Sequence, residues 1–221
     1  MLKLKFLPII ILPFLLTGFA SGQELEKVLT AKTFTNARGE NLPYRLFVPA
    51  NYDRLKKYPL IVFLHGSGGL GNDNLKQLQL GNLYLIDRFT QSESQSRYPA
   101  FVVAPQSIGE GWVAANDRIT PSRQLRLAVE LIDDLRRTYS IDSGRLYVAG
   151  QSLGGFGTFA IISAYPQCLR PAFLSVAAAM NRKPQNTKAR RSGSFTVRRT
   201  SRCRSQIRGK WWRRSSRPED K

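Results

Sequence analysis

The sequence predicts an α/β fold, in which a mostly parallel sheet carries helices on both faces. Short apolar runs alternate with helical stretches along the body of the chain, and this alternation is typical of parallel sheets. The predicted strands are Tyr44–Val48, Leu60–Leu64, Phe101–Ala104 and Leu146–Ala149. A chain of 221 residues is long enough for one such domain.

The clearest helix is predicted from Ser122 to about Thr138. Apolar residues recur on one face at helical spacing, at Leu125, Ala128, Val129, Ile132 and Leu135. Pro121 precedes this stretch, and Ser122 can cap it. Residues 71–96 are rich in Asn and Gln and predict an excursion of helix and loop between two strands.

The last predicted strand leads directly into a glycine-rich pentapeptide. The run is Gly150-Gln151-Ser152-Leu153-Gly154, and a helix-like stretch follows over 156–164. A Gly-x-Ser-x-Gly run between strand and helix is typical of a nucleophile elbow, a strained turn that exposes the serine hydroxyl. Glycines flank the serine because a β-carbon there would collide with the strand or the helix. The alternative is a glycine-rich turn with an incidental serine.

A second glycine-rich segment follows the strand that ends at Leu64. It reads His65-Gly66-Ser67-Gly68-Gly69. Backbone N–H groups in such a loop stabilise the negative charge that develops on a carbonyl oxygen during acyl transfer. We expect the donors to be the N–H of Leu153 and that of Ser67 or Gly68. A phosphate-binding loop is the alternative, but this segment lacks the spacing and the lysine of a P-loop.

These motifs resemble those of secreted serine esterases with the α/β-hydrolase fold. This group includes feruloyl esterases, polyhydroxybutyrate depolymerases and prolyl-oligopeptidase-like peptidases. The resemblance runs from Leu42 to about Gln167. Its segments are Leu42–Pro49, Asn51–Asp53, Tyr58–Leu60, the His65 loop, Gly71–Asn74, Phe101–Gln106, Gly111–Val113 and Gly150–Thr158. It implies hydrolysis of carboxylic esters through an acyl-serine intermediate.

The resemblance also implies roles for individual residues. Ser152 is the expected nucleophile, and Leu153, Ser67 and Gly68 are the expected oxyanion-hole donors. The residues expected to support them are His65, Gly66, Gly150, Gln151 and Gly154. The substrate would be a small-molecule or polysaccharide-linked ester, and the chemistry requires no metal and no organic cofactor. Trp112 is either a stacking surface for a sugar or an aromatic acid, or a buried structural residue.

The sequence lacks the partners that such a serine needs. A serine hydroxyl requires a base that a carboxylate orients, and in this fold the acid and then the histidine follow the serine. After Ser152 the only carboxylates are those of Glu219 and Asp220, and the only histidine of the chain is His65. We interpret His65 as a structural residue of its loop; the alternative is that it acts as the base.

The segment 168–221 differs in composition from the rest of the chain. It holds 16 of the 34 Lys and Arg residues but only 2 of the 15 Asp and Glu residues. Apolar periodicity is nearly absent after Asn181. We therefore expect the hydrolase-like domain to cover 23–167, truncated after the nucleophile helix, and 168–221 to be a disordered basic tail.

A change of reading frame near Cys168 would explain this tail. The codon freedom of 192–210 permits, in another frame, a His-Gly turn and an Asp followed by Val-Pro-Val. In the esterases that this chain resembles, that segment carries the triad acid, and the catalytic histidine lies further on. The tail and the missing partners would then have one cause.

A functional tail is the alternative. Arg-rich segments with interleaved Trp bind nucleic acid or anionic surfaces, because neutralising phosphates releases counterions. The candidate contacts are Arg198, Arg199, Arg202, Arg204, Arg208, Lys210, Arg213 and Arg214. A non-catalytic protein of the same fold could bind through them. The predicted export signal argues against it, so we expect no nucleic-acid partner.

The amino-terminal residues predict export. Lys3 and Lys5 precede an apolar stretch, 6–16, and small residues continue to Gly22. This pattern is typical of a signal peptide over 1–22, and it predicts a secreted or periplasmic protein with no transmembrane segment after cleavage. The alternative is an uncleaved anchor. Cys168 and Cys203 have no spacing that would indicate a zinc site or a disulfide framework.

Overall fold

The computed structural model describes residues 22–79, 83–117, 119–166 and 169–175. The predicted signal peptide, both cysteines and the tail beyond residue 175 lie outside these residues. The strands are β1 Thr30–Thr35, β2 Asn41–Phe47, β3 Tyr58–Leu64, β4 Phe101–Pro105, β5 Ile141–Gln151 and β6 Arg170–Ser175. The α-helices are α1 Gly22–Val28, α2 Leu83–Thr90, α3 Ser92–Arg97, α4 Arg123–Thr138 and α5 Leu153–Ala164.

The strands form one mixed sheet in the order β1-β2-β4-β3-β5-β6. β4, β3, β5 and β6 are parallel neighbours, whereas β1 and β2 join the sheet antiparallel at one edge. The predicted α/β fold with a mostly parallel sheet is therefore confirmed. Because β3 and β5 lie side by side, the loops that follow them leave from the same edge of the sheet.

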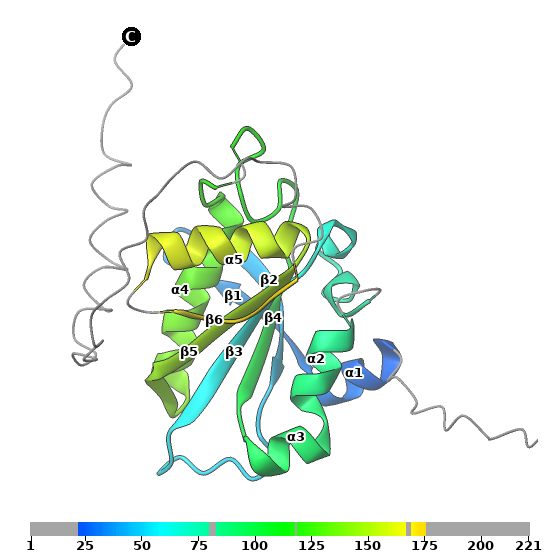
Figure 1. The fold of residues 1–221 in the computed structure, drawn as a ribbon, viewed down its shortest axis with the longest axis vertical. Coiled ribbons are helices and arrows are strands. Elements are labelled where there is room, and N and C mark those ends of the chain that lie inside the picture. The colour runs from blue at the N-terminus through cyan, green and yellow to red at the C-terminus, as the bar shows by residue number, and fades with distance from the viewer. Residues whose placement is uncertain (1–21, 80–82, 118, 167–168, 176–221) are drawn as a thin grey trace, which may run out of the picture.

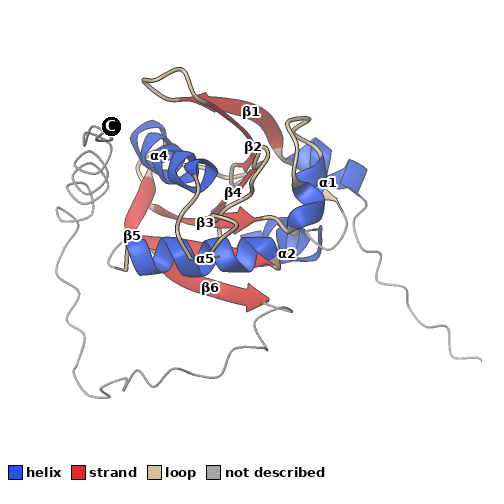
Figure 2. Cartoon of the chain, turned by 90° about the horizontal axis from the view of Figure 1, so that it is seen from above, coloured by secondary structure: helices blue, strands red, loops and turns tan. Residues whose placement is uncertain are grey.

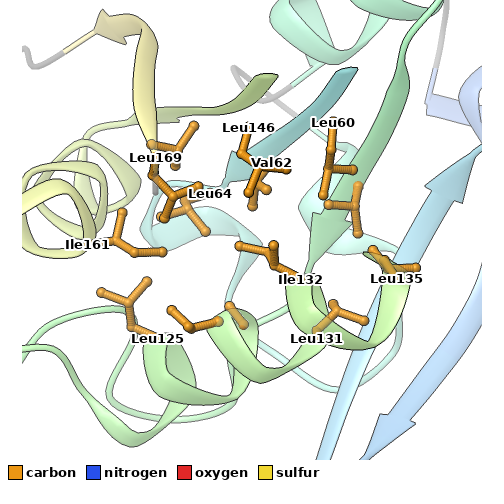
Figure 3. Close-up of a cluster of buried hydrophobic side chains, with 14 of the residues drawn as sticks. Leu60, Val62, Leu64, Leu125, Leu131, Ile132, Leu135, Leu146, Ile161 and Leu169 are labelled. Atoms are coloured by element: carbon orange, nitrogen blue, oxygen red, sulfur yellow. The ribbon is translucent and has the colours of Figure 1, made fainter. Parts of the chain in front are cut away.

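Apolar side chains of β3 face alternately to the two sides of the sheet. Leu60, Val62 and Leu64 pack with residues of α4 and α5, as Figure 3 shows. Phe63 belongs to a second buried cluster that includes Ile86 of α2. Figure 1 shows α4 and α2 on opposite sides of the sheet, and Figure 2 shows the same layers from above. Helices cover both faces, as predicted.

Helix α4 begins where the sequence predicts. Ser122 is its N-cap, and the Ser122 hydroxyl accepts a hydrogen bond from the N–H of Leu125 at 3.2 Å. This cap satisfies one of the amide groups that have no partner within the helix. The apolar face predicted from the spacing is buried throughout, at Leu125, Ala128, Val129, Ile132 and Leu135.

Three elements lie outside the predicted strands and helices. β1 and α1 precede the first predicted strand, and β6 falls inside the segment 168–221. The packed sheet therefore extends to Ser175, past the predicted boundary at residue 167, while the rest of the tail lies outside the described residues. The excursion predicted over 71–96 contains α2 and most of α3. Within the described parts of the chain, no helix is both long and apolar enough to span a membrane.

Candidate active site

Ser152 occupies a sharp turn between β5 and α5. Its backbone angles are φ 51° and ψ −114°, a left-handed conformation that non-glycine residues adopt only where the surrounding structure enforces it. The Ser152 carbonyl accepts hydrogen bonds from the N–H groups of Gly155 at 2.9 Å and Phe156 at 3.3 Å, which start the helix. The side chain is partly exposed. This geometry is that of a nucleophile elbow.

The flanking glycines allow the elbow to lie against its neighbours. A β-carbon at Gly154 would overlap the backbone carbonyl of Leu64, and one at Gly150 would overlap the carbonyl of Gly154. Both close approaches involve main-chain atoms, which cannot move aside as a flexible side chain can. The Gly-x-Ser-x-Gly spacing is thus explained by contacts on both sides of the serine.

The glycine-rich loop after β3 lies beside the elbow. Leu64 and Gly150 are register partners at the ends of the parallel strands β3 and β5, so the loops that follow are neighbours. Ser67 begins a short 3-10 turn, Ser67–Gly69, and Leu153 is the first residue of α5. Amide groups in the first turn of a helix have no partner within it. The predicted donors Ser67 and Leu153 are therefore each the first residue of a helical segment, and both segments lie at the same edge of the sheet.

His65 is fully buried and bonded on both ring nitrogens. Its Nε2 accepts the backbone N–H of Ser107 at 2.9 Å, and its Nδ1 lies 2.6 Å from the carbonyl of Gly66. Because Nε2 accepts, Nδ1 must carry the proton that it shares with Gly66. Burial lowers the pKa of His65 to about 4. Both nitrogens are thus committed to the backbone, which supports the structural role over that of a base.

A buried amide holds the far end of the same loop. Gln106 is fully buried, and its Nε2 donates to the carbonyl of Gly69 at 3.2 Å and to Asp73 at 2.8 Å. Its Oε1 accepts the N–H of Asn74 at 2.5 Å. No role for this side chain is predicted from the sequence, because its partners lie more than thirty positions away along the chain.

Trp112 is fully buried. The hypothesis that it stacks on a sugar or an aromatic acid is therefore wrong for this conformation, and the structural alternative is correct. Its indole N–H donates to the carbonyl of His65 at 2.9 Å.

The described residues place no histidine other than His65 near Ser152, and the carboxylates that follow Ser152 in the chain are not among them. The chain has a single histidine, and Glu219 and Asp220 lie outside the described residues, as do the Arg residues of the tail. Among the residues that the structure describes, no group of three or more His, Cys, Asp or Glu is placed to hold a metal ion. What the described residues bring together is a candidate nucleophile, Ser152, and two sets of candidate oxyanion donors.

Comparison with known proteins agrees with this geometry. The chain is 31% identical over 121 residues to an Aspergillus terreus protein named "Probable feruloyl esterase C". The aligned region covers 55% of this chain and 41% of that protein. The crystal structure of a thermostable esterase superposes with a TM-score of 0.61 at 36% identity, over 65% of this chain and 39% of that one. No family model matches the chain.

The chain therefore has the α/β-hydrolase fold, and its resemblance to the esterases of that fold is confirmed. It spans about two fifths of the length of each of these two relatives. Its described residues contain a six-stranded sheet of that fold, with the turn at Ser152 and the loop after β3.

Proposed function

We propose that this chain carries the nucleophile half of a serine esterase that hydrolyses carboxylic esters. The observation that carries the proposal is the left-handed backbone of Ser152 at the junction of β5 and α5. A strained serine of this kind persists only where the rest of the fold over-determines it, and such strain concentrates at functional sites. The similarity to two esterases supports the same reaction class.

The proposed reaction has two stages. The Ser152 oxygen adds to the ester carbonyl carbon, its proton passes to a base, and the alcohol leaves. The N–H groups of Leu153 and of Ser67 or Gly68 stabilise the oxyanion, each donor being worth roughly 3 kcal/mol. Water then hydrolyses the acyl-serine, which releases the acid and regenerates the hydroxyl.

The base is what these 221 residues lack. His65 cannot accept the proton, because both of its nitrogens are bonded to backbone groups. Loss of the base from such a triad lowers turnover by a factor on the order of 10⁶. We therefore expect this chain alone to have almost no esterase activity at neutral pH.

The proposed substrates are small-molecule or polysaccharide-linked esters, and the proposed location is outside the cytoplasm. One relative is named as a feruloyl esterase, which supports esters of an aromatic acid as the first substrates to try. The predicted signal peptide supports secretion or a periplasmic site.

The reading-frame hypothesis accounts for the missing base. It is tested by the nucleotide sequence of the gene, translated in all three frames from codon 168 to the next stop codon. We expect one of the other two frames to encode a short apolar strand, then an acidic residue, then a histidine. The absence of such text from every frame would contradict the hypothesis.

An added base tests the proposed chemistry in the chain as it is. Imidazole at high concentration can take the proton that a catalytic histidine would take. We expect p-nitrophenyl acetate and methyl ferulate to be cleaved faster with imidazole than the buffer reaction explains, with first-order dependence on protein. Ser152→Ala is the matched control. Equal imidazole-dependent rates for both proteins would overturn the proposal.

A further inference from the structure

We propose that Trp112 is a positioning residue that fixes the spacing between the two sides of the oxyanion hole. This inference rests on the proposed function, and it assigns a role to a residue that takes no part in the chemistry. The two sides are the loop after β3, with Ser67 and Gly68, and the start of α5, with Leu153.

Trp112 holds the first side by a hydrogen bond. Its indole N–H donates to the carbonyl of His65 at 2.9 Å, and the two rings lie 4.9 Å apart between centroids. His65 is fully buried, so no water can replace the indole as a donor at low cost. Since His65 immediately precedes the Gly66–Gly69 segment, this bond sets where the loop begins.

Trp112 holds the second side by packing. A β-carbon on Gly157 of α5 would lie 2.6 Å from Cβ of Trp112, so the indole side chain lies directly on the helix backbone. The preceding residue, Gly111, lies against the side chain of Leu153 at the start of α5. A β-carbon there would lie 2.6 Å from Cδ2 of Leu153.

The pair Gly111 and Trp112 is itself anchored. Both anchoring hydrogen bonds come from Ser122, the N-cap of α4. The Ser122 hydroxyl donates to the carbonyl of Gly111 at 2.7 Å, and the backbone N–H of Ser122 donates to the carbonyl of Trp112 at 3.0 Å. One dipeptide thus lies between the loop after β3 and α5, and α4 holds it in place.

The energetic consequence concerns only the charged oxygen. Oxyanion donors act when both lie within about 3 Å of one oxygen atom, and a displacement of about 1 Å can cost a factor of about 10². Trp112→Phe keeps the β-carbon and the first ring carbon against Gly157 but removes the donor to His65. Gly157→Ala keeps that donor but pushes the indole away from the helix. Both changes alter the spacing from opposite sides.

Phenylboronic acid is the probe for this spacing. The Ser152 oxygen adds to its trigonal boron and releases a proton to the buffer, which gives a tetrahedral anion that mimics the oxyanion. The fraction of tetrahedral boron is measured by ¹¹B NMR for the parent chain, Trp112→Phe, Gly157→Ala, Ser152→Ala and Phe101→Leu. Phe101 is an equally buried aromatic residue at the opposite, amino-terminal end of β4, so its variant controls for loss of stability.

We expect the affinity for phenylboronic acid to fall about tenfold or more in Trp112→Phe and Gly157→Ala. It should stay within about twofold of the parent in Phe101→Leu, even where thermal unfolding shows a similar loss of stability. Parent-like affinity in a folded Trp112→Phe variant overturns the inference. An equal loss in Phe101→Leu also overturns it, because stability alone would then explain the result.

The serine control separates this inference from the proposed function. Binding by the parent that disappears in Ser152→Ala supports the nucleophile, and the Trp112 result is then decided on its own. A parent chain that forms no tetrahedral adduct, or forms as much of it in Ser152→Ala, overturns the proposed function and the inference that rests on it.

Discussion

Gly154 lies against the backbone of Leu64, so closely that a β-carbon at position 154 would overlap the Leu64 carbonyl. This contact brings the first turn of α5 onto the end of β3. It explains how the turn after β5 and the loop after β3 come to lie beside each other.

Gly154→Ala should therefore destabilise the fold strongly. The added methyl group meets main-chain atoms of β3, and overpacking of this kind costs about 3 kcal/mol or more where the backbone must shift. Urea unfolding measures the change. Gly144→Ala is the matched control in β5, since its β-carbon would meet only a side-chain oxygen of Asp142, at 3.3 Å. Equal losses from the two substitutions would contradict the close approach.

The strain at Ser152 predicts an unusual order of stabilities. Ser152→Gly should be more stable than Ser152→Ala by about 1 kcal/mol, because glycine adopts a φ of 51° without steric cost and alanine does not. At ordinary positions in regular structure the order is the reverse. Thermal unfolding of the two variants checks it, and a more stable alanine variant would show that position 152 is relaxed.

The burial of His65 predicts a loss of stability in mild acid. Its folded-state pKa is about 4, below the ordinary 6.5, so the unfolded chain takes up the proton first as the pH falls. The free energy of unfolding should decrease by roughly 3 kcal/mol between about pH 6.5 and pH 4, and this contribution should level off below pH 4. His65→Gln should flatten the urea-unfolding profile in that window; an unchanged slope would contradict the prediction.

Glu40 predicts a second, more acidic transition. Burial opposes its ionisation, but hydrogen bonds from Asn36, Arg38 and Arg123 outweigh this and lower its pKa from 4.5 to about 2. The stabilisation is present above about pH 4.5 and is lost as the pH falls towards 2, up to about 3 kcal/mol. Glu40→Gln should remove this dependence without affecting the His65 window. A decrease in the free energy of unfolding that is complete above about pH 5 would contradict the low pKa of Glu40.

The sequence predicted the centre of the fold better than its edges. The strands around β3 and β5 are apolar runs, and their burial on both sides makes them legible. β1 has mostly exposed residues, so its sequence shows no alternation, and it forms because β2 offers six register partners. β6 contains Pro171 and lies at the start of the segment 168–221, whose basic composition hid a short apolar strand that pairs with β5.

At the site, the spacing of the glycines around the serine predicted the turn. The hydrogen bonds that hold the neighbouring loop join residues far apart in the sequence. Ser152 and its glycines follow from spacing alone. The bonds of Gln106 to Gly69 and of Trp112 to His65 join segments that are 37 and 47 positions apart. No periodicity reports such pairs; the available signal was that Gln106 and Trp112 both lie in segments that resemble the esterases.

The most direct test of the nucleophile is the position of an acyl group on the protein. The chain is treated briefly with p-nitrophenyl acetate and imidazole, quenched in acid, digested and mapped by mass spectrometry. We predict one acetyl group on the hydroxyl of Ser152, and none at that peptide in Ser152→Ala. Acetylation spread over lysines alone, with Ser152 unmodified, would contradict the central claim.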